Sequence, residues 1–362
     1  MPSIKQPGDV RLARRPTRNG AKEMLIGLQE AAYGAQKLSA LFQVLSQQGL
    51  SADEILRDVG ISVDQILSPA TRLSRGQLLA ACRNAIALSE DRHTPFQVGA
   101  SIHLSAYGMY GFAILCCPDF RKAIDFALRY HVLAAPLTTV EFHEQDGLGT
   151  WSIEPLTQAV TDPDLYRFIT EMQISIQISM MRDRMGPAFT PREIKLSYPK
   201  SSRSALPTEE LDCDVSFSAQ RNQMIFDASW LDGPPLLSNR VTYPKLLEIC
   251  DDLLAELELK FGLAGKIRLL LVQDIANPPT ISAIASSLGI HERSLRRQLH
   301  EQGLSFRGLI DELRTILALR YLRTTALSSE DIAAALGFSD TANFRRAFHR
   351  WTGTSPSKIK TE

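Results

Sequence analysis

The sequence predicts an α+β N-terminal domain, with helices and a small, mostly antiparallel sheet, followed by an all-α C-terminal domain. The second domain is expected to hold two helix-turn-helix units joined by a long helix. Helical periodicity gives way to strand patterns between residues 138 and 226, and a six-residue motif recurs after 48 residues near the C-terminus. At 362 residues, the chain has room for two domains, each with its own core.

The first domain is expected over residues 24–240. Apolar side chains in residues 24–135 recur with helical spacing. Asp146-Gly147 then separates two alternating segments, a combination typical of a β-hairpin. Gly186-Pro187 ends one long predicted helix, and short strands follow it. The predicted hairpin strands, long helix and later strands cover residues 138–143, 150–153, 164–185, 193–198, 215–217 and 223–226.

A linker helix is expected between the domains, over residues 241–265. Its apolar positions 247, 250, 254 and 257 are spaced like a seam, which fits either packing against the first domain or contact with a second copy of the chain. Gly262 and Gly265 are expected to cut this helical pattern short. At the other end of the chain, residues 1–23 are basic and predict a disordered leader.

Composition excludes several classes of protein. No apolar run approaches the ~20 residues that a membrane span needs, so we expect no membrane partner. Residues 266–362 hold 14 Lys and Arg against 9 Asp and Glu, although the whole chain has 40 of each kind. The positive charge that phosphate requires therefore lies in the second domain. Five cysteines without a C-x-x-C pair disfavour a disulfide framework and a zinc site, and favour a cytoplasmic protein without metal or cofactor.

The strongest pattern is an internal repeat, I-A-x-x-L-G, at residues 284–289 and again at 332–337. Each copy predicts a short helix, a glycine at a sharp turn, and a second helix. The small alanine lets the two helices cross closely, and glycine tolerates the turn. Leu295 and Phe344 are expected to face inward and anchor the second helix of each copy.

Polar side chains are expected on the outer face of each second helix. Arginine pairs bidentately with guanine and asparagine with adenine, so this is the chemistry of base reading in the major groove of double-stranded DNA. Residues 306–324 predict one helix between the two copies, which at 1.5 Å per residue spans roughly 28 Å. Such a rod can hold two recognition helices about one duplex turn, ~34 Å, apart.

Residues 332–358 read IAAALGFSDTANFRRAFHRWTGTSPSK and resemble the signature of the AraC/XylS family of bacterial transcription regulators. The resemblance covers about residues 266–360. It implies that Gly337-Phe338-Ser339-Asp340 forms the turn before the second recognition helix, and that Gly353, Ser355 and Pro356 close the domain. It also implies binding to promoter DNA, RNA polymerase as a partner, and activation as the usual outcome.

Family members read bases mainly from the first recognition helix. Ala342 is short where a longer polar residue would reach a base, so weaker specificity is expected from the second helix. An alternative for individual arginines is pairing with Glu292, Glu301 or Asp340. The expected base-reading residues are Arg293, Arg296, Arg297, Thr341, Asn343 and Arg346, and the expected phosphate contacts are Arg345, Arg350 and Lys358.

The first domain resembles one branch of the same family, whose effector domain is described as arabinose-binding-like. The resemblance rests on His103-Leu104-Ser105-Ala106-Tyr107-Gly108 with Gly111, on NQMIFDASWL at 222–231, and on Asn239-Arg240. The label does not imply arabinose as the ligand. Aromatic and histidine side chains favour a mixed polar and apolar effector pocket, although each could equally be an ordinary core or surface residue. The candidates are Tyr107, Tyr110, His131 and Trp151.

The sequence therefore predicts a transcription regulator that is controlled by an unidentified small-molecule effector, and we expect it to act as a homodimer. No G-x-S-x-G, H-E-x-x-H or G-x-G-x-x-G motif supports an enzyme. Two alternatives stay open: an effector-independent DNA-binding protein whose first domain serves only for oligomerisation, and a degenerate enzyme retained as a sensor.

Overall fold

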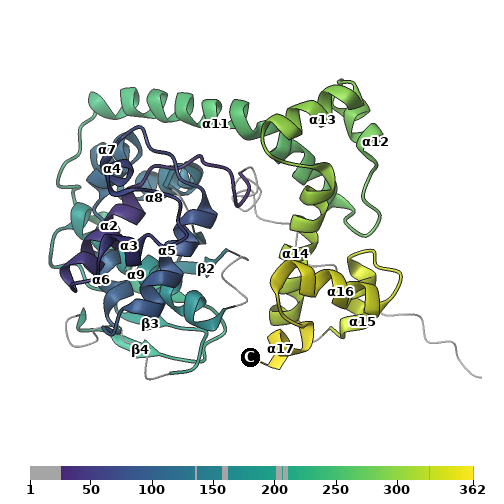
Figure 1. Cartoon of the computed structure of the whole chain (residues 1–362). Coiled ribbons are helices and arrows are strands. Elements are labelled where there is room, and N and C mark those ends of the chain that lie inside the picture. Colours follow the sequence, from purple (N-terminus) through teal and green to yellow (C-terminus); the bar gives the residue numbers. More distant parts are fainter. Residues whose placement is uncertain are drawn as a thin grey trace, which may run out of the picture.

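Figure 1 shows a computed structural model of the whole chain, in which the two predicted domains stand side by side. The structure describes residues 26–134, 137–156, 162–200, 206, 211–325 and 327–361. The predicted basic leader, residues 1–23, lies outside the described residues. A single long helix, α11, runs along the top of the first domain and reaches into the second.

The first domain begins with helices, as its periodicity predicts. In α2 the apolar side chains Leu38, Leu41 and Leu45 are fully buried, and they recur at three- and four-residue intervals. The helices that precede the sheet are α2 Gln36–Gln47, α3 Ala52–Ile55, α4 Val63–Leu67, α5 Arg75–Leu88, α6 Thr94–Ala100, α7 Gly108–Cys116 and α8 Phe120–Arg129, with short 3₁₀ helices at Leu104–Tyr107 and His131–Ala134.

A five-stranded sheet completes this domain, with strand order β1-β2-β5-β3-β4. Only β3 and β4 pair in parallel among the described strands, so the sheet is mostly antiparallel, as expected. The β1–β2 hairpin is confirmed, because Asp146 and Gly147 take φ values of 52° and 75° at its turn. The strands are β1 Thr138–Gln145, β2 Leu148–Pro155, β3 Glu193–Lys195, β4 Asp214–Ser216 and β5 Gln223–Asp227.

Helix α9, Pro163–Met185, packs on one face of this sheet. Ile174 and Ile178 of α9 share a buried cluster with Trp151 and Met224 of the sheet. Asp162 caps the helix through hydrogen bonds from the backbone N–H groups of residues 164 and 165, and Gly186 ends it at φ 99°. The predicted long helix is therefore confirmed.

Helix α11, Thr242–Gln273, is longer than the sequence predicts. The expectation that Gly262 and Gly265 cut the helix short was wrong. Neither glycine has a positive φ. Each costs roughly 1 kcal/mol relative to alanine inside a helix, and packing at both ends outweighs that cost. Leu246, Cys250 and Leu254 belong to the core of the first domain, whereas Ala264, Ile267 and Leu271 belong to the core of the second.

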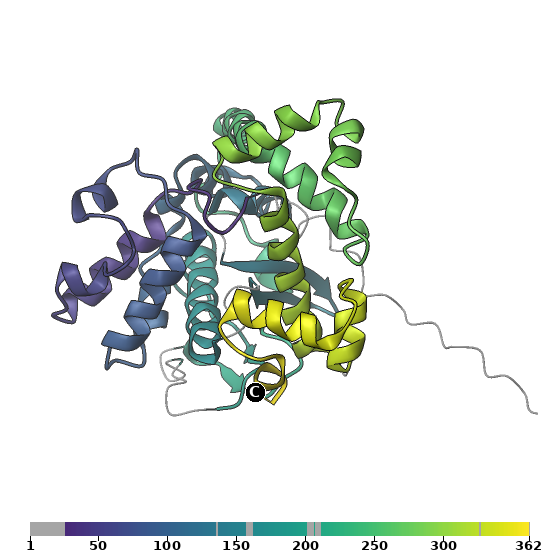
Figure 2. The ribbon, with the colours of Figure 1, turned by 45° about the vertical axis from the view of Figure 1, so that its right-hand side comes forward.

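The second domain is helical, with α14 standing between the pair α12–α13 and the pair α15–α16 (Figures 1 and 2). The predicted helix over residues 306–324 matches α14. Among the described residues, no single helix is long and apolar enough to cross a membrane. One pair of helices, Thr94–Ala100 and Leu104–Cys116, reaches that length and apolar composition only when the two are taken together, and the pair is sharply bent. The helices of this domain after α11 are α12 Ile281–Ser287, α13 Glu292–Glu301, α14 Phe306–Thr324, α15 Ser329–Ala335, α16 Thr341–Thr352 and α17 Pro356–Thr361.

Candidate functional site

The first repeat folds as a helix-turn-helix made of α12 and α13. Thr280 caps α12 by accepting a hydrogen bond from the backbone N–H of Ala283 at 3.2 Å. Gly289 turns the chain between the helices at φ 69°. The side chains of Leu295 and Leu299 are buried and fix α13 against the core, so the other faces of α13 point outward.

The second repeat, α15 and α16, has a more constrained turn. Ser328 and Asp331 form a capping box at the start of α15. Gly337 lies at φ 75°, and a Cβ there would overlap the carbonyl oxygen of Ala276, so only glycine fits. Asp340 caps α16 by accepting a hydrogen bond from the backbone N–H of Asn343 at 2.6 Å, and this bond lowers the pKa of Asp340.

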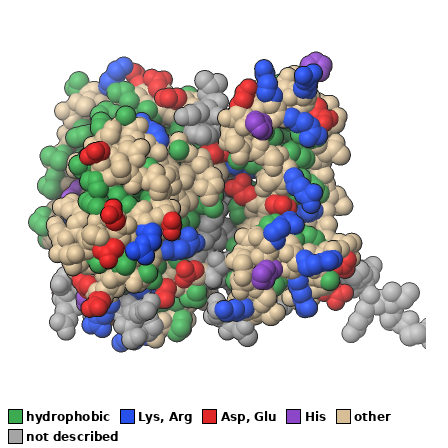
Figure 3. All heavy atoms as spheres, viewed as in Figure 1, with side chains coloured by type: hydrophobic (Ala, Val, Ile, Leu, Met, Phe, Trp, Pro, Cys, Tyr) green, Lys and Arg blue, Asp and Glu red, His purple; other side chains and the backbone are tan. Residues whose placement is uncertain are grey.

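The predicted DNA-contacting residues lie on the outer surface of these helices. Phe344, like Leu295, is fully buried, which turns its neighbours outward as expected. Figure 3 shows basic side chains spread over α13, α14 and α16 on one face of the second domain. Those exposed are Arg293, Arg296, Arg297, Arg345, Arg346, Arg350 and Lys358, while Thr341 and Asn343 are half-buried.

Several of these side chains pair with acidic or amide groups on the same surface. Arg296 donates to Glu292 at 2.7 Å, and Arg350 lies 3.3 Å from Asp311. Arg346 donates to the amide oxygen of Asn343 at 2.7 Å. Such exposed pairs contribute ~0–1 kcal/mol, because water screens them, so a phosphate or base can displace the acidic partner at little cost.

The four predicted effector residues lie around one small cavity of the first domain. Tyr107, Tyr110, His131 and Trp151 all line this inner chamber, which has a volume of about 30 Å³. They come from the 3₁₀ helix at Leu104–Tyr107, from α7, from the 3₁₀ helix at His131–Ala134 and from β2. The structure thus brings together residues that are separated by up to 44 positions in the sequence.

Sequence reasoning missed three polar residues of the inner chamber, namely Lys37 of α2 and Gln173 and Gln177 of α9. The sequence could have indicated Lys37, because it falls on the same face of the predicted helix as the apolar Ala40 and Leu41, which are buried. Burial lowers the pKa of the Lys37 ammonium to about 8. A charged residue on an apolar stripe marks either an error in the helix assignment or a polar site within the core.

A larger outer pocket, of about 550 Å³, shares Tyr107 and Tyr110 with the inner chamber. Its volume falls within the range of small-molecule sites. Helix α11 contributes Leu253, Glu256 and Leu257 to its wall. The same helix continues into the second domain, so one wall of the pocket is formed by the helix that connects the two domains.

The residues behind the looser N-terminal resemblance have structural roles. A Cβ on Gly111 would overlap the backbone of Leu104, so the glycine lets α7 pack closely against the preceding turn. Asn222 is fully buried and donates to the hydroxyl of Tyr166 at 2.7 Å. Asn239 accepts hydrogen bonds from two backbone N–H groups at the start of α11.

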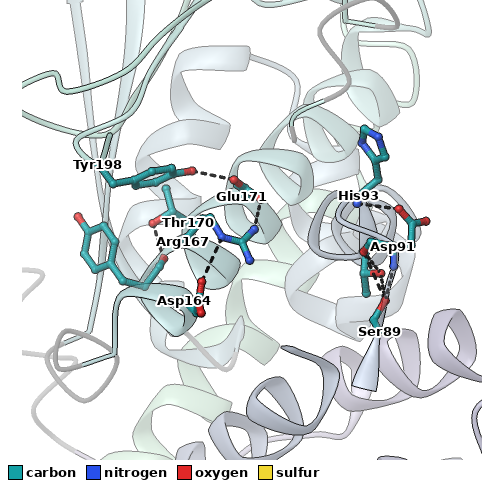
Figure 4. A network of polar contacts seen from close by, with 10 residues as sticks. Ser89, Asp91, His93, Asp164, Arg167, Thr170, Glu171 and Tyr198 are labelled. Carbon is teal, nitrogen blue, oxygen red and sulfur yellow. Dashed lines mark hydrogen bonds and ion pairs between the residues drawn. The ribbon is translucent and has the colours of Figure 1, made fainter. Parts of the chain in front are cut away.

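The two domains also meet through buried polar groups. Arg268 of α11 lies 3.3 Å from Glu30 of the first domain and 3.2 Å from Glu312 of α14. A second network lies on α9, where Arg167 contacts Glu171 at 3.0 Å and Tyr198 donates to Glu171 at 3.0 Å (Figure 4). Tyr198 packs edge-on against Tyr166, and Tyr166 belongs to the same buried cluster as the core of the second domain.

No three His, Cys, Asp or Glu side chains gather as metal ligands within the part of the chain that the structure describes. All five cysteines are free. Cys82 is buried beside Lys37, and burial raises the pKa of its thiol to about 12, so it is an unreactive core thiol.

Both domains match known protein families. The family described as "Arabinose-binding domain of AraC transcription regulator, N-term" matches residues 49–235, and the family described as "Helix-turn-helix domain" matches residues 284–362. The Ornithine utilization regulator of Pseudomonas aeruginosa is 29% identical over 324 residues, covering 89% of this chain and 94% of that protein. The HTH-type transcriptional regulator VqsM of the same organism is 23% identical over 277 residues, covering 73% and 82%. The crystal structure of the transcriptional regulator CdpR, also from P. aeruginosa, covers 90% of this chain and 98% of its own at 18% identity and a TM-score of 0.48.

Proposed function

The chain belongs to the AraC family of transcription regulators, and from this premise we propose that a small molecule bound by the first domain controls how the second domain engages promoter DNA. The observation that carries this proposal is the position of α11. Its Leu253, Glu256 and Leu257 line the outer pocket, and its last turns pack into the core of the helix-turn-helix domain.

A ligand in the outer pocket would therefore touch the helix that connects the two domains. Linkage requires the ligand to bind two states of the protein with different affinity. We propose that the two states differ in the tilt or position of α11. Leu253 and the buried Ile267 belong to this one helix, so a shift of the helix at the pocket also moves its end in the second domain. The helix-turn-helix units would then be offered to DNA in a different orientation when the pocket is filled.

On DNA, we propose that α13 reads bases and that α16 contributes more to docking. Arg293, Arg296 and Arg297 give α13 three long guanidinium side chains, which suit bidentate recognition of guanine. In α16, Ala342 is exposed and too short to reach a base edge, while Arg345, Arg346 and Arg350 can meet phosphates. Binding as a homodimer and activation through RNA polymerase are the further parts of this proposal.

The effector model is tested on the full-length chain by screening a broad set of metabolites for a rise in Tm. Each compound that raises Tm is then added to a titration of the protein with a DNA duplex chosen by selection. We expect such a compound to change the Kd for that duplex. If no compound raises Tm, or if those that do leave the Kd for DNA unchanged, the first domain serves assembly and the effector model fails.

A filled-pocket variant and a matched control locate the site. Leu253→Trp places an indole in the outer pocket and should abolish the response to every compound that binds there. Val241→Trp adds the same side chain at a position that is 88% exposed beside the start of α11, and it should leave the response unchanged. Equal behaviour of the two variants would place the binding site elsewhere.

A further inference from the structure

Three uncharged polar side chains line the inner chamber without a hydrogen-bond partner in the part of the chain that the structure describes. Trp151 is 2% exposed, and its indole Nε1–H has no acceptor there. Gln173 and Gln177 are 5% and 8% exposed, and their side-chain amides have no described partner either. Buried polar groups are normally paired, so this set indicates a partner that comes from outside the chain.

Rigid elements hold these three side chains. Gln173 and Gln177 are one turn apart on α9, so both lie on the same face of that helix. Trp151 comes from β2, on which α9 packs, and its ring lies against that of Phe142 at a centroid distance of 5.0 Å. The donor and the two amides are therefore presented from two neighbouring elements of the core.

The chamber also has two basic side chains in its wall, Lys37 and His131. Each of them already interacts with other groups of the protein. The hydrogen-bonding capacity left open on the three side chains described above thus belongs to groups without charge. Enclosing a charged group is costly unless an opposite charge pairs with it, so the open groups suit an uncharged partner.

The size of the chamber limits that partner to a small group. The chamber has a volume of about 30 Å³, whereas one water molecule needs roughly 10–15 Å³, so it has space for about two polar atoms. The outer pocket of about 550 Å³ shares Tyr107 and Tyr110 with it, and apolar side chains such as Ile66, Leu253 and Leu257 contribute to its wall. The two cavities together suit a ligand with a small polar end and a larger, partly apolar body.

We propose that the ligand of the first domain has an uncharged amide-type end, such as a carboxamide, a lactam or a cyclic imide, which lies in the inner chamber while the body of the ligand fills the outer pocket against α11. This inference rests on the proposed function, since it names the chemical class of the effector. The carbonyl oxygen of the ligand accepts from the indole N–H of Trp151. Its N–H donates to the side-chain oxygen of Gln173 or Gln177.

The chemistry of the open groups distinguishes an amide from other polar ends. An indole N–H only donates, whereas a glutamine amide both donates and accepts. A carboxylate only accepts, so it supplies no hydrogen to the glutamine oxygens. An ammonium group only donates, so it supplies no acceptor to Trp151. An amide carries one acceptor and one donor on a single carbon, and these are the two polar atoms for which the chamber has room.

The first test compares matched compounds on the full-length protein. Phenylacetamide, benzamide and hexanamide are each measured beside the carboxylate and the primary amine of the same carbon skeleton, by the rise in Tm and by calorimetric Kd. We expect one or more amides to bind, and the matching carboxylate and amine to bind at least tenfold more weakly. A carboxylate or amine that binds as tightly as its amide, or a failure of all the amides to bind, would overturn the amide assignment.

The indole N–H of Trp151 gives a direct readout of the contact. The chain has three tryptophans, Trp151, Trp230 and Trp351, so a protein labelled with ¹⁵N-tryptophan gives three indole signals, and Trp151→Phe assigns the first of them. Binding of the amide should shift the Trp151 signal, because its N–H gains an acceptor. The Trp230 signal should stay in place. An amide that binds without moving the Trp151 signal would place the ligand outside the inner chamber and overturn the proposal.

Variants with matched controls assign the contacts. Trp151→Phe keeps an aromatic ring and removes the donor, and the double variant Gln173→Leu/Gln177→Leu removes both amides. Each should raise the Kd of the amide about tenfold or more. Trp230→Phe, and Gln43→Leu on the exposed face of α2, should leave that Kd unchanged. Unchanged affinity in both chamber variants would overturn the proposal, and the Trp151 signal of the wild-type protein decides the question if neither variant folds.

The outcomes separate this inference from the proposed function. Carboxylates or amines that bind more tightly than the amides, and lose their binding in Leu253→Trp, would leave the effector model standing and would overturn the amide assignment. A complete lack of binding by these compounds and by the wider metabolite set would overturn both.

Discussion

The guanidinium of Arg268 lies 3.3 Å from the carboxylate of Glu30, and both side chains are almost completely buried, at 1% and 3% exposure. Glu30 belongs to the first domain and also accepts a hydrogen bond from the backbone N–H of Gly27 at 2.7 Å. Arg268 belongs to the last turns of α11 and also contacts Glu312 of α14. One buried cation thus joins the first domain to both long helices of the second.

Arg268→Met should destabilise the protein by ~3–5 kcal/mol, because it leaves two carboxylates next to an apolar side chain at the domain junction. The free energy of unfolding in urea measures this loss. Lys245→Met breaks an ion pair whose side chains are 71% and 66% exposed on the same helix, and it should cost much less, because water screens the pair. Similar losses in the two variants would mean that the buried junction contributes no more than a surface pair.

Gly337→Ala should cost more stability than Gly289→Ala. Both glycines have positive φ, 75° and 69°, so each substitution incurs ~1–2 kcal/mol of backbone strain. Only at Gly337 would the new Cβ also overlap the carbonyl oxygen of Ala276, while no atom lies within 4 Å of one at Gly289. Thermal unfolding of the two variants gives the comparison, and equal Tm values would contradict it.

Arg296→Ala should weaken binding to the selected DNA site by ~1–3 kcal/mol and should weaken binding to random duplex DNA much less. The side chain is 60% exposed, and its present partner Glu292 is one turn away on the same helix. Arg345→Ala is the control, because a phosphate contact is lost equally on every sequence and lowers the salt dependence of binding. Equal losses for Arg296→Ala on both duplexes would reassign it to phosphate contact.

Lys37→Met should make the ligand-free protein more stable at neutral pH, by up to ~3 kcal/mol, because burial lowers the pKa of this lysine from 10.5 to about 8. The folded state holds this proton less tightly than the unfolded state does. The penalty is therefore complete below pH 8 and is relieved as the pH rises from 8 towards 10.5. Urea unfolding at pH 7 and pH 10 should show the difference between wild type and variant shrinking, and a variant less stable than wild type at pH 7 would contradict this.

Features set by neighbouring residues were predictable from the sequence. The two-residue turn of this hairpin requires positive φ at both positions, and Asp146-Gly147 is a pair that adopts such values readily, so the pair identified the hairpin. The repeated I-A-x-x-L-G motif located both helix-turn-helix units, since its alanine and glycine act within a few residues of their own positions. The helix over residues 306–324 matched α14 for the same reason.

Features set by distant contacts were not predictable. Gly262 and Gly265 indicate a helix end locally, but α11 is stabilised from outside by packing on two cores. The strand expected over residues 193–198 ends at Lys195, where its pairing with both β4 and β5 ends. Lys37 and Arg268 become buried only when other elements close over them, so their sequence neighbours did not identify them.

The central claim is that two helix-turn-helix units on one rigid helix bind a specific DNA sequence, and selection of duplexes from a random pool by the full-length protein tests it most directly. Because α14 fixes the distance between α13 and α16, the enriched duplexes should share two short sequence boxes about 10 base pairs apart, on one face of the duplex. The box bound by α13 should be the more sharply defined. A pool that yields no enriched sequence, or boxes whose spacing varies freely, would contradict the account.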